Sequence, residues 1–302
     1  MGNLILLLFC FGLGIGLRQI GRLPESTSVV LNAFIINISL PAMALVYLHE
    51  LRLTPELIYS ALAPWVMFLV AIGVLWLACR SMDLPRHTTG CVILVGGLAN
   101  TSFIGIPMIE AFYGPDWMSV GIVIDQLGSY LVLSFLGIAI ARIFSGGPQP
   151  DFADIAKRVI RFPPLIATIA ALLLLSVPYP DWLETLLARL ADTVAPLALV
   201  SVGFQLRLSE VKGKLRPLVL ALSYNLVVGP LVVLAFFAGL LGGRGVIMQV
   251  TVFEAAMAPM IGASIVAMDN DLDPSLATLL VALGVPLSFV TLAAWYLVLA
   301  EL

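Results

Sequence analysis

Long stretches without a single charged side chain constrain this chain most. Residues 57–79 and 274–299 contain no Asp, Glu, Lys or Arg and consist mainly of apolar residues. A helix needs about 20 such residues to cross a hydrocarbon core about 30 Å thick, because it rises about 1.5 Å per residue. Charged residues make up 11% of the chain, against roughly 25% in soluble domains. The sequence predicts a polytopic helical membrane protein, and it excludes a soluble enzyme and, at a net charge of −3, a nucleic-acid binder.

The apolar stretches predict an all-α polytopic membrane protein with ten transmembrane helices. Turn and charge signals, such as Gly114-Pro115-Asp116, separate neighbouring stretches. No loop is long enough for a soluble domain. The predicted spans are 2–18, 27–48, 57–79, 88–112, 118–143, 161–178, 186–206, 216–240, 245–268 and 274–299.

The distribution of Lys and Arg predicts the orientation of the spans. Twelve of the fifteen basic residues lie in odd-numbered loops or at the adjoining span ends. Cytoplasmic loops carry the excess of basic residues. We therefore expect a multi-pass protein of the cytoplasmic (inner) membrane with both its N-terminus and its C-terminus outside. The three even-loop exceptions are Arg52, Arg189 and Arg244.

The two halves of the chain resemble each other weakly. Pro41 and Pro196 are 155 residues apart, and so are Asp116 and Asp271. An odd number of spans per half inverts the second half in the membrane, as in many transporters. We expect two inverted five-helix repeats, residues 1–143 and 161–302, joined by a cytoplasmic linker over 144–160.

A proline preceded by polar groups interrupts the fourth and the ninth predicted span. Pro107 follows Asn100-Thr101-Ser102, and Pro259 follows Glu254. Proline removes a helical hydrogen bond, and such a break at membrane depth is tolerated where it lines a cavity. We expect both helices to be broken, with second halves that start near Pro107 and Pro259. Matched breaks in both halves point to a transporter binding site.

The run Gly97-Leu98-Ala99-Asn100-Thr101-Ser102-Phe103-Ile104-Gly105-Ile106-Pro107 closely resembles the fourth-span signature of the auxin efflux carrier family. Leu40-Pro41 and Ala258-Pro259 also fit. The short central loop resembles the prokaryotic branch. The resemblance implies a fold similar to that of bile-acid sodium symporters, in which spans 4 and 9 unwind and cross. It implies a scaffold of spans 1, 2, 6 and 7, a transport domain of spans 3–5 and 8–10, and organic anions as cargo.

Three polar residues on three spans share one depth. Asp125, Glu254 and Asn100 each lie about 12–13 Å from the outer surface, and ionisable groups there are functional candidates. With Thr101, Gln126 and Ser129 they suit Na⁺ or a proton. Resemblance to the sodium sites of bile-acid symporters adds that Asn100, Thr101, Ser129 and Glu254 hold Na⁺, and we include Asp125. The alternative is a hydrogen-bond network that only holds helices together.

No Lys or Arg lies near mid-membrane, so the positive ends of the broken helices must help to hold an anion. For Asp192 three alternatives stay open: a place beside Asn37 on the scaffold side of the cavity, a second proton carrier, or a simple pair with Arg189. We expect the anion to contact Asn100, Thr101, Ser102, Pro107, Ala258 and Pro259, with Asn37 on the scaffold side.

The sequence thus predicts a secondary active transporter of small organic anions (carboxylates) that works by alternating access, as an elevator or by rocking. Its expected partners are a small organic acid and the lipid bilayer; a homodimer is one possible assembly. No cofactor is expected other than a coupling ion, Na⁺ or H⁺. Alternatives are a membrane-embedded lipid-modifying enzyme and a non-transporting receptor, although neither paired acidic motifs nor a nucleophile with a base is present.

Overall fold

Most of the described residues are helical, in keeping with long apolar stretches that contain many Leu and Ala residues, which favour helices. The computed structural model describes residues 2–49, 51, 54–146, 152–175, 177–205 and 213–302. These residues contain helices and no strand, which confirms the all-helical prediction for the described part of the chain. They form two compact units, each built from three separate stretches of sequence.

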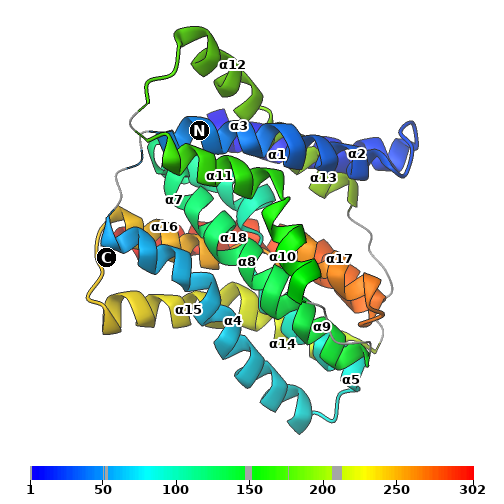
Figure 1. The fold of residues 1–302 in the computed structure, drawn as a ribbon. Coiled ribbons are helices and arrows are strands. Elements are labelled where there is room, and N and C mark those ends of the chain that lie inside the picture. Colours follow the sequence, from blue (N-terminus) through cyan, green and yellow to red (C-terminus); the bar gives the residue numbers. More distant parts are fainter. Residues whose placement is uncertain (1, 50, 52–53, 147–151, 176, 206–212) are drawn as a thin grey trace. The chain divides into compact units, whose positions relative to one another are not determined.

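The first unit contains residues 1–54, 102–122 and 157–206. In it α1 and α13 pack side by side (Figure 1). Gly14 and Gly203 permit this close approach, because a Cβ atom on either one would lie 2.2 Å from a backbone carbonyl oxygen of the partner helix. The helices of this unit are α1 (Gly2–Ile20), α2 (Thr27–Phe34), η1 (Ile35–Ser39), α3 (Leu40–His49), α6 (Ile106–Phe112), η3 (Pro115–Trp117), most of α7 (Met118–Val123), α11 (Pro163–Leu173), α12 (Asp181–Ala191) and α13 (Val194–Gln205).

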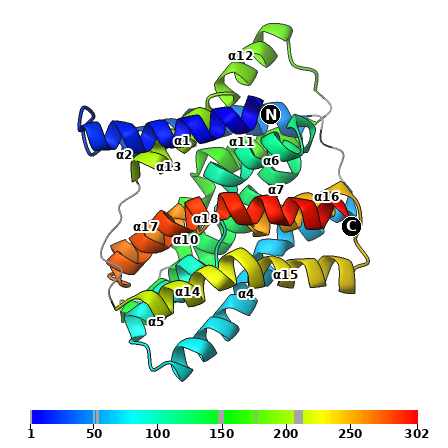
Figure 2. The ribbon, with the colours of Figure 1, turned by 180° about the vertical axis from the view of Figure 1, so that it is seen from behind.

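The second unit contains residues 55–101, 123–156 and 207–302. Its C-terminal helix, α18, lies beside α16 and α17 (Figure 2). The helices of this unit are α4 (Pro55–Ser81), α5 (Arg86–Gly96), η4 (Ile124–Ser129), α8 (Tyr130–Val132), η5 (Leu133–Gly137), α9 (Ile138–Ser145), α14 (Leu215–Ser223), η6 (Tyr224–Val228), α15 (Gly229–Leu234), η7 (Ala235–Leu240), α16 (Val246–Ala255), α17 (Ile261–Asp269) and α18 (Pro274–Ala300).

Three helical elements divide between the units. These are α7, whose last residue Val123 belongs to the second unit, the π-helical turn η2 (Thr101–Gly105) and α10 (Phe152–Ile160). The helix α10 falls in the expected linker, of which residues 147–151 lie outside the described residues, as do the basic residues Arg52, Arg207 and Lys212.

Among the described residues, six helices are long and apolar enough to cross a membrane, and four shorter apolar helices accompany them. The long ones are Thr27–His49, Pro55–Ser81, Pro115–Ser145, Asp181–Gln205, Leu215–Leu240 and Pro274–Ala300. The shorter ones are Ile5–Ile20, Thr101–Phe112, Pro163–Leu173 and Val246–Ala255. Length and composition therefore support a multi-pass membrane protein.

Three predicted boundaries are wrong. The sixth predicted span continues to residue 178, but α11 ends at Leu173, before a segment that contains Pro178 and Pro180. The seventh begins at 186, but its helix begins at Asp181, where Pro180 and acidic residues favour a helix start. The second half of the fourth span begins at Thr101 and not near Pro107.

Candidate functional site

Two unwound segments meet in the middle of the second unit. The helix α5 ends at Gly96 and η2 begins at Thr101, whereas α16 ends at Ala255 and α17 begins at Ile261. The segments between them, residues 97–100 and 256–260, lie antiparallel and pair at Ala99 and Pro259. We call these two segments the crossover.

Backbone hydrogen bonds join the two segments of the crossover. The Asn100 amide donates to the Ala258 carbonyl at 2.8 Å, and the Met260 amide donates to the Leu98 carbonyl at 3.0 Å. Broken helices leave such groups without helical partners, and an unpaired buried amide or carbonyl is costly. Each break therefore satisfies polar groups of the other, and the expected unwinding of both helices is observed.

Glycine allows other helices to approach the crossover. A Cβ atom on Gly284 of α18 would lie 2.4 Å from Cδ of Pro259, and one on Gly96 would lie 2.8 Å from Cβ of Ala221 in α14. Pro259 itself cannot donate a backbone hydrogen bond, which favours the break. Pro107, by contrast, lies in the first turn of α6, a position where proline fits a helix without breaking it.

A hydrogen-bonded carboxylate lies next to the crossover. Thr101 Oγ1 donates to Asp125 Oδ1 and Gln126 Nε2 donates to Asp125 Oδ2, both at 2.6 Å. Asp125 and Gln126 belong to the π-helical turn η4, and each is only 2% exposed. The Asp125 carboxylate thus has a donor on each oxygen.

Glu254 has very different surroundings. Its side chain is 0% exposed, and neither of its carboxyl oxygens has a hydrogen-bond partner among the described residues. Burying an ionised carboxylate without a partner is very costly. Glu254 is therefore the side chain here that most needs a proton or a cation.

A small cavity borders the crossover and the helix α4. Its volume is about 10 Å³, about the space of one water molecule. The hydroxyl-bearing residues Thr101, Ser129 and Thr251 line it together with residues 97–99. Thr101 and Ser129, which the sequence places beside the residues of shared depth, thus line the same cavity.

Four of the predicted site residues belong to the first unit. Asn37 is exposed and donates to the Ala33 carbonyl of its own helix at 2.8 Å. Pro107 and Asp192 line a second cavity of about 10 Å³. No ion pair joins Asp192 to Arg189 in the part of the chain that the structure describes. Ser102 is buried and follows Thr101 directly.

Sequence reasoning missed two polar residues. Glu110 lines the same cavity as Asp192. Asn225 is 0% exposed and donates its side-chain amide to the Leu98 carbonyl of the crossover at 3.1 Å. A signal for Asn225 existed, because it is the sole Asn, Gln, Asp or Glu within 216–240.

The oxygen-rich chemistry of the second unit suits a hard cation. Carboxylate, amide and hydroxyl oxygens are the ligands that such ions prefer. Asn100, Thr101, Asp125, Ser129 and Glu254 would supply them to Na⁺. Within the described residues no group of three or more His, Cys, Asp or Glu side chains could hold a metal.

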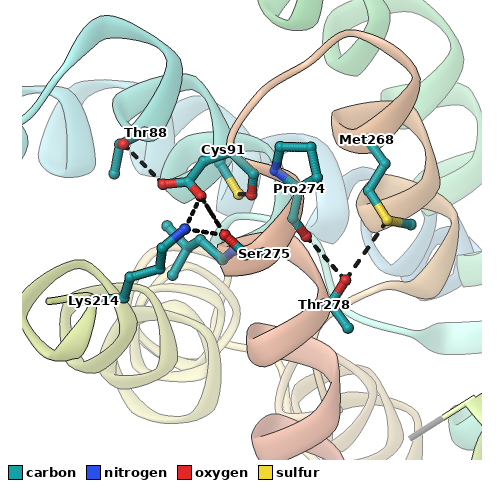
Figure 3. Close-up of polar contacts among 9 residues, drawn as sticks. Thr88, Cys91, Lys214, Met268, Pro274, Ser275 and Thr278 are labelled. Atoms are coloured by element: carbon teal, nitrogen blue, oxygen red, sulfur yellow. Dashed lines mark hydrogen bonds and ion pairs between the residues drawn. The ribbon is translucent and has the colours of Figure 1, made fainter. Parts of the chain in front are cut away.

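A polar clamp joins three helix starts in the second unit (Figure 3). The Asp273 carboxylate accepts from Thr88 Oγ1 at 2.9 Å, from Leu276 N at 3.3 Å and from Lys214 Nζ in an ion pair. Burial alone would raise the pKa of Asp273, but the hydrogen bonds from Lys214, Thr88 and Leu276 hold this pKa below its ordinary value. The clamp ties α5 and α14 to α18, the helix that packs on Pro259.

Comparison with known proteins gives consistent matches over most of the chain. A family model described as a membrane transport protein matches residues 1–145 and 153–296. An uncharacterized transporter of Methanothermobacter thermautotrophicus is 28% identical over 290 residues, covering 95% of this chain and 94% of that protein. An uncharacterized transporter of Methanocaldococcus jannaschii is 24% identical over 284 residues, covering 91% of each chain.

Proposed function

Because this chain belongs to the membrane transport protein family, we propose that it is a secondary transporter of small organic anions that works by alternating access. The resemblance of its fourth-span signature to auxin efflux carriers is confirmed by this membership. The transport function itself follows the family, whereas the substrate class, the coupling and the mechanism are our proposal.

The crossover is the observation that carries the proposal. Irregular backbone in the middle of apolar helices is tolerated where it lines a cavity or is buried in protein, and in transporters it marks binding sites. The helices that begin at Thr101 and Ile261 start there. Such starts carry about half a positive charge and free amide groups, which favour an anion. Asn100, Thr101, Ser102, Pro107, Ala258, Pro259 and Asn37 are the proposed substrate contacts.

A coupling ion, Na⁺ or H⁺, would bind at the buried carboxyl groups beside the crossover. Glu254 lacks a donor for either carboxyl oxygen among the described residues, so a proton or a cation would remove the cost of its charge. Asp125, Gln126 and Ser129 would complete this ion site, and Asp192 would form a second one.

The proposed architecture has ten spans in two inverted five-helix repeats. Spans 1, 2, 6 and 7 would form the scaffold, and spans 3–5 and 8–10 would form the domain that moves. The excess of basic residues in odd-numbered loops supports a position in the cytoplasmic membrane with both termini outside.

Ligand-dependent thermal stabilisation tests the proposal. The purified protein is heated with each member of a panel of dicarboxylic and aromatic acids. At 100 times its dissociation constant a ligand stabilises by about 2.7 kcal/mol. We expect at least one acid to raise the melting temperature of the wild type by several degrees, and to leave Asn100→Ala unchanged.

Asn32→Ala provides the matched control. Asn32 accepts a hydrogen bond from Ser201 in the first unit at 2.6 Å and is not among the proposed contacts. This variant should keep the response of the wild type. An equal response of Asn100→Ala would contradict the proposed site, and a panel without any stabilising acid would contradict the proposed substrate class.

A further inference from the structure

The π-helical turn η6 contacts three other parts of the second unit through three consecutive residues. Tyr224 Oη donates to the Met67 carbonyl of α4 at 2.6 Å, and Asn225 Nδ2 donates to the Leu98 carbonyl of the crossover at 3.1 Å. The Leu226 carbonyl accepts from Trp295 Nε1 of α18 at 2.9 Å. Tyr224, Asn225 and Leu226 are all buried. A π-helical turn frequently marks a functional site in a helix.

The hydrogen bond fixes which way the Asn225 amide faces. A backbone carbonyl oxygen can only accept, so the amide nitrogen of Asn225 must face Leu98. Its Oδ1 atom is buried and has no donor among the described residues. An unsatisfied buried atom of this kind costs free energy, because it has lost its contacts with water. A side chain with such a cost at this position suggests a role for it.

Unwinding frees the Leu98 carbonyl from its helical hydrogen bond. In an uninterrupted helix this carbonyl would accept from the amide four residues later. Here it accepts from Met260 N at 3.0 Å and from Asn225 Nδ2 at 3.1 Å. The first bond ties the two segments to each other, and the second ties them to the neighbouring helix. Asn225 is thus a side chain that anchors the crossover backbone from outside it.

Close packing of two helices brings Asn225 to this place. Gly96 ends α5 and lies against Ala221 of α14, one turn before Asn225. A side chain on Gly96 would separate the helices. Four residues later, Gly229 lies against Met67, where a Cβ atom would be 2.4 Å from Cε of Met67. The helix that carries Asn225 is therefore held close to its neighbours on both sides of η6.

We propose that Asn225 is a positioning residue of the substrate site: by holding the Leu98 carbonyl it sets the backbone geometry with which the crossover binds its ligand. This inference rests on the proposed function, because it assigns a role within that site. Asn225 does not contact the substrate. Its loss should weaken binding through the crossover backbone, while the fold of the helix persists.

The test compares Asn225 with its neighbour Tyr224. Asn225→Leu removes the amide donor and keeps a similar volume, and Asn225→Asp places a carboxylate oxygen against the Leu98 carbonyl. Tyr224→Phe removes a buried hydrogen bond of the same turn, but this bond joins the turn to α4 and not to the crossover. For each variant, the melting temperature and the KM for uptake of a stabilising organic acid are measured in proteoliposomes.

We expect a KM raised roughly tenfold in both Asn225 variants, as for the loss of one buried hydrogen bond. Tyr224→Phe should lower the melting temperature but keep the wild-type KM. A wild-type KM in a folded Asn225→Leu protein would overturn the inference. So would an equal rise of KM in Tyr224→Phe, because the effect would then belong to the turn as a whole. If the wild type binds no acid, the proposed function fails and not this inference alone.

Discussion

At the scale of single residues, two carboxyl groups near the crossover differ in what surrounds them. Asp125 receives hydrogen bonds on both oxygens, whereas Glu254 receives none among the described residues. Carboxyl groups in unlike environments commonly take different protonation and binding roles. We propose that Asp125, which also holds Thr101, is a fixed part of the ion site and that Glu254 exchanges the coupling ion.

Glu254→Gln should uncouple transport from its ion. The amide keeps the size of the side chain but cannot carry the negative charge that binds a proton or a cation. We expect uptake driven by an ion gradient to fall at least tenfold, while exchange of labelled for unlabelled substrate continues. Glu184→Gln on the exposed surface of α12 serves as the control. Unchanged ion-driven uptake by Glu254→Gln would refute this role.

The sequence alone predicts that several site residues lie at a similar depth in the membrane. Helical rise alone places Asn100, Asp125 and Glu254 at one depth, and the structure joins Thr101 to Asp125. The sequence marks Asn225 as the sole Asn, Gln, Asp or Glu within 216–240 but does not show which way it faces, because the π-helical turn that contains it changes which side chains of the helix face inward. Nor could it divide the predicted residues between two compact units.

At the scale of helices, the crossover depends on close packing against α18. Gly284→Ala would add a Cβ methyl group only 2.4 Å from Cδ of Pro259, which is too close for two carbon atoms that are not bonded. Overpacking of this kind typically costs about 1–3 kcal/mol. We expect a melting temperature lower by several degrees and a loss of most transport activity.

Gly73→Ala is the matched control for Gly284→Ala. Gly73 also lies inside a long helix of the second unit, but nothing lies within 4 Å of a Cβ atom there. Alanine favours a helix over glycine by up to about 1 kcal/mol. This variant should be as stable as the wild type or slightly more stable, and fully active. Equal behaviour of the two variants would show that the contact with Pro259 is unimportant.

The Asp273 clamp predicts a defined pH dependence of stability. Its lowered pKa means that the contribution to stability is complete above the ordinary carboxyl pKa of about 3.9 and is lost as the pH falls through the lowered value. Asp273→Asn should therefore lower the melting temperature by a few degrees at pH 7. The difference from the wild type should shrink as the pH falls below about 4.

Asp271→Asn is the control for the effect that an Asp-to-Asn substitution in this loop has on the melting temperature. Asp271 is exposed and has a left-handed backbone (φ 53°) like that of Asp273 (φ 49°), so the same substitution tests the backbone without the clamp. Melting curves of both variants between pH 3 and 7 make the comparison. A difference for Asp273→Asn that persists unchanged at low pH would contradict the clamp.

Helix prediction succeeded where an apolar stretch is long and ends in charged or turn residues. Predicted 57–79 and 274–299 correspond to α4 and α18 within two residues. It failed at the short helices because the apolar composition continues beyond their ends. Leu174 and Val177, for example, follow the end of α11 at Leu173. Apolar composition indicates burial or lipid contact but does not end a helix.

At the scale of the whole molecule, the charge pattern predicts the orientation. Single cysteines can be introduced at exposed loop positions after the native buried Cys10, Cys79 and Cys91 are replaced. With an impermeant thiol reagent added outside whole cells, Asp116→Cys should react and Ser81→Cys should react only after permeabilisation. The reverse pattern would contradict the proposed topology.

The central claim is that the chain carries organic anions through a site built at the crossover. Uptake of the stabilising acid into proteoliposomes, with sodium and proton gradients imposed separately, tests it most directly. The account predicts saturable uptake that one of the two gradients accelerates and that Asn100→Ala abolishes. Uptake that is absent under both gradients for every dicarboxylic and aromatic acid tried, in protein shown to be folded, would contradict it.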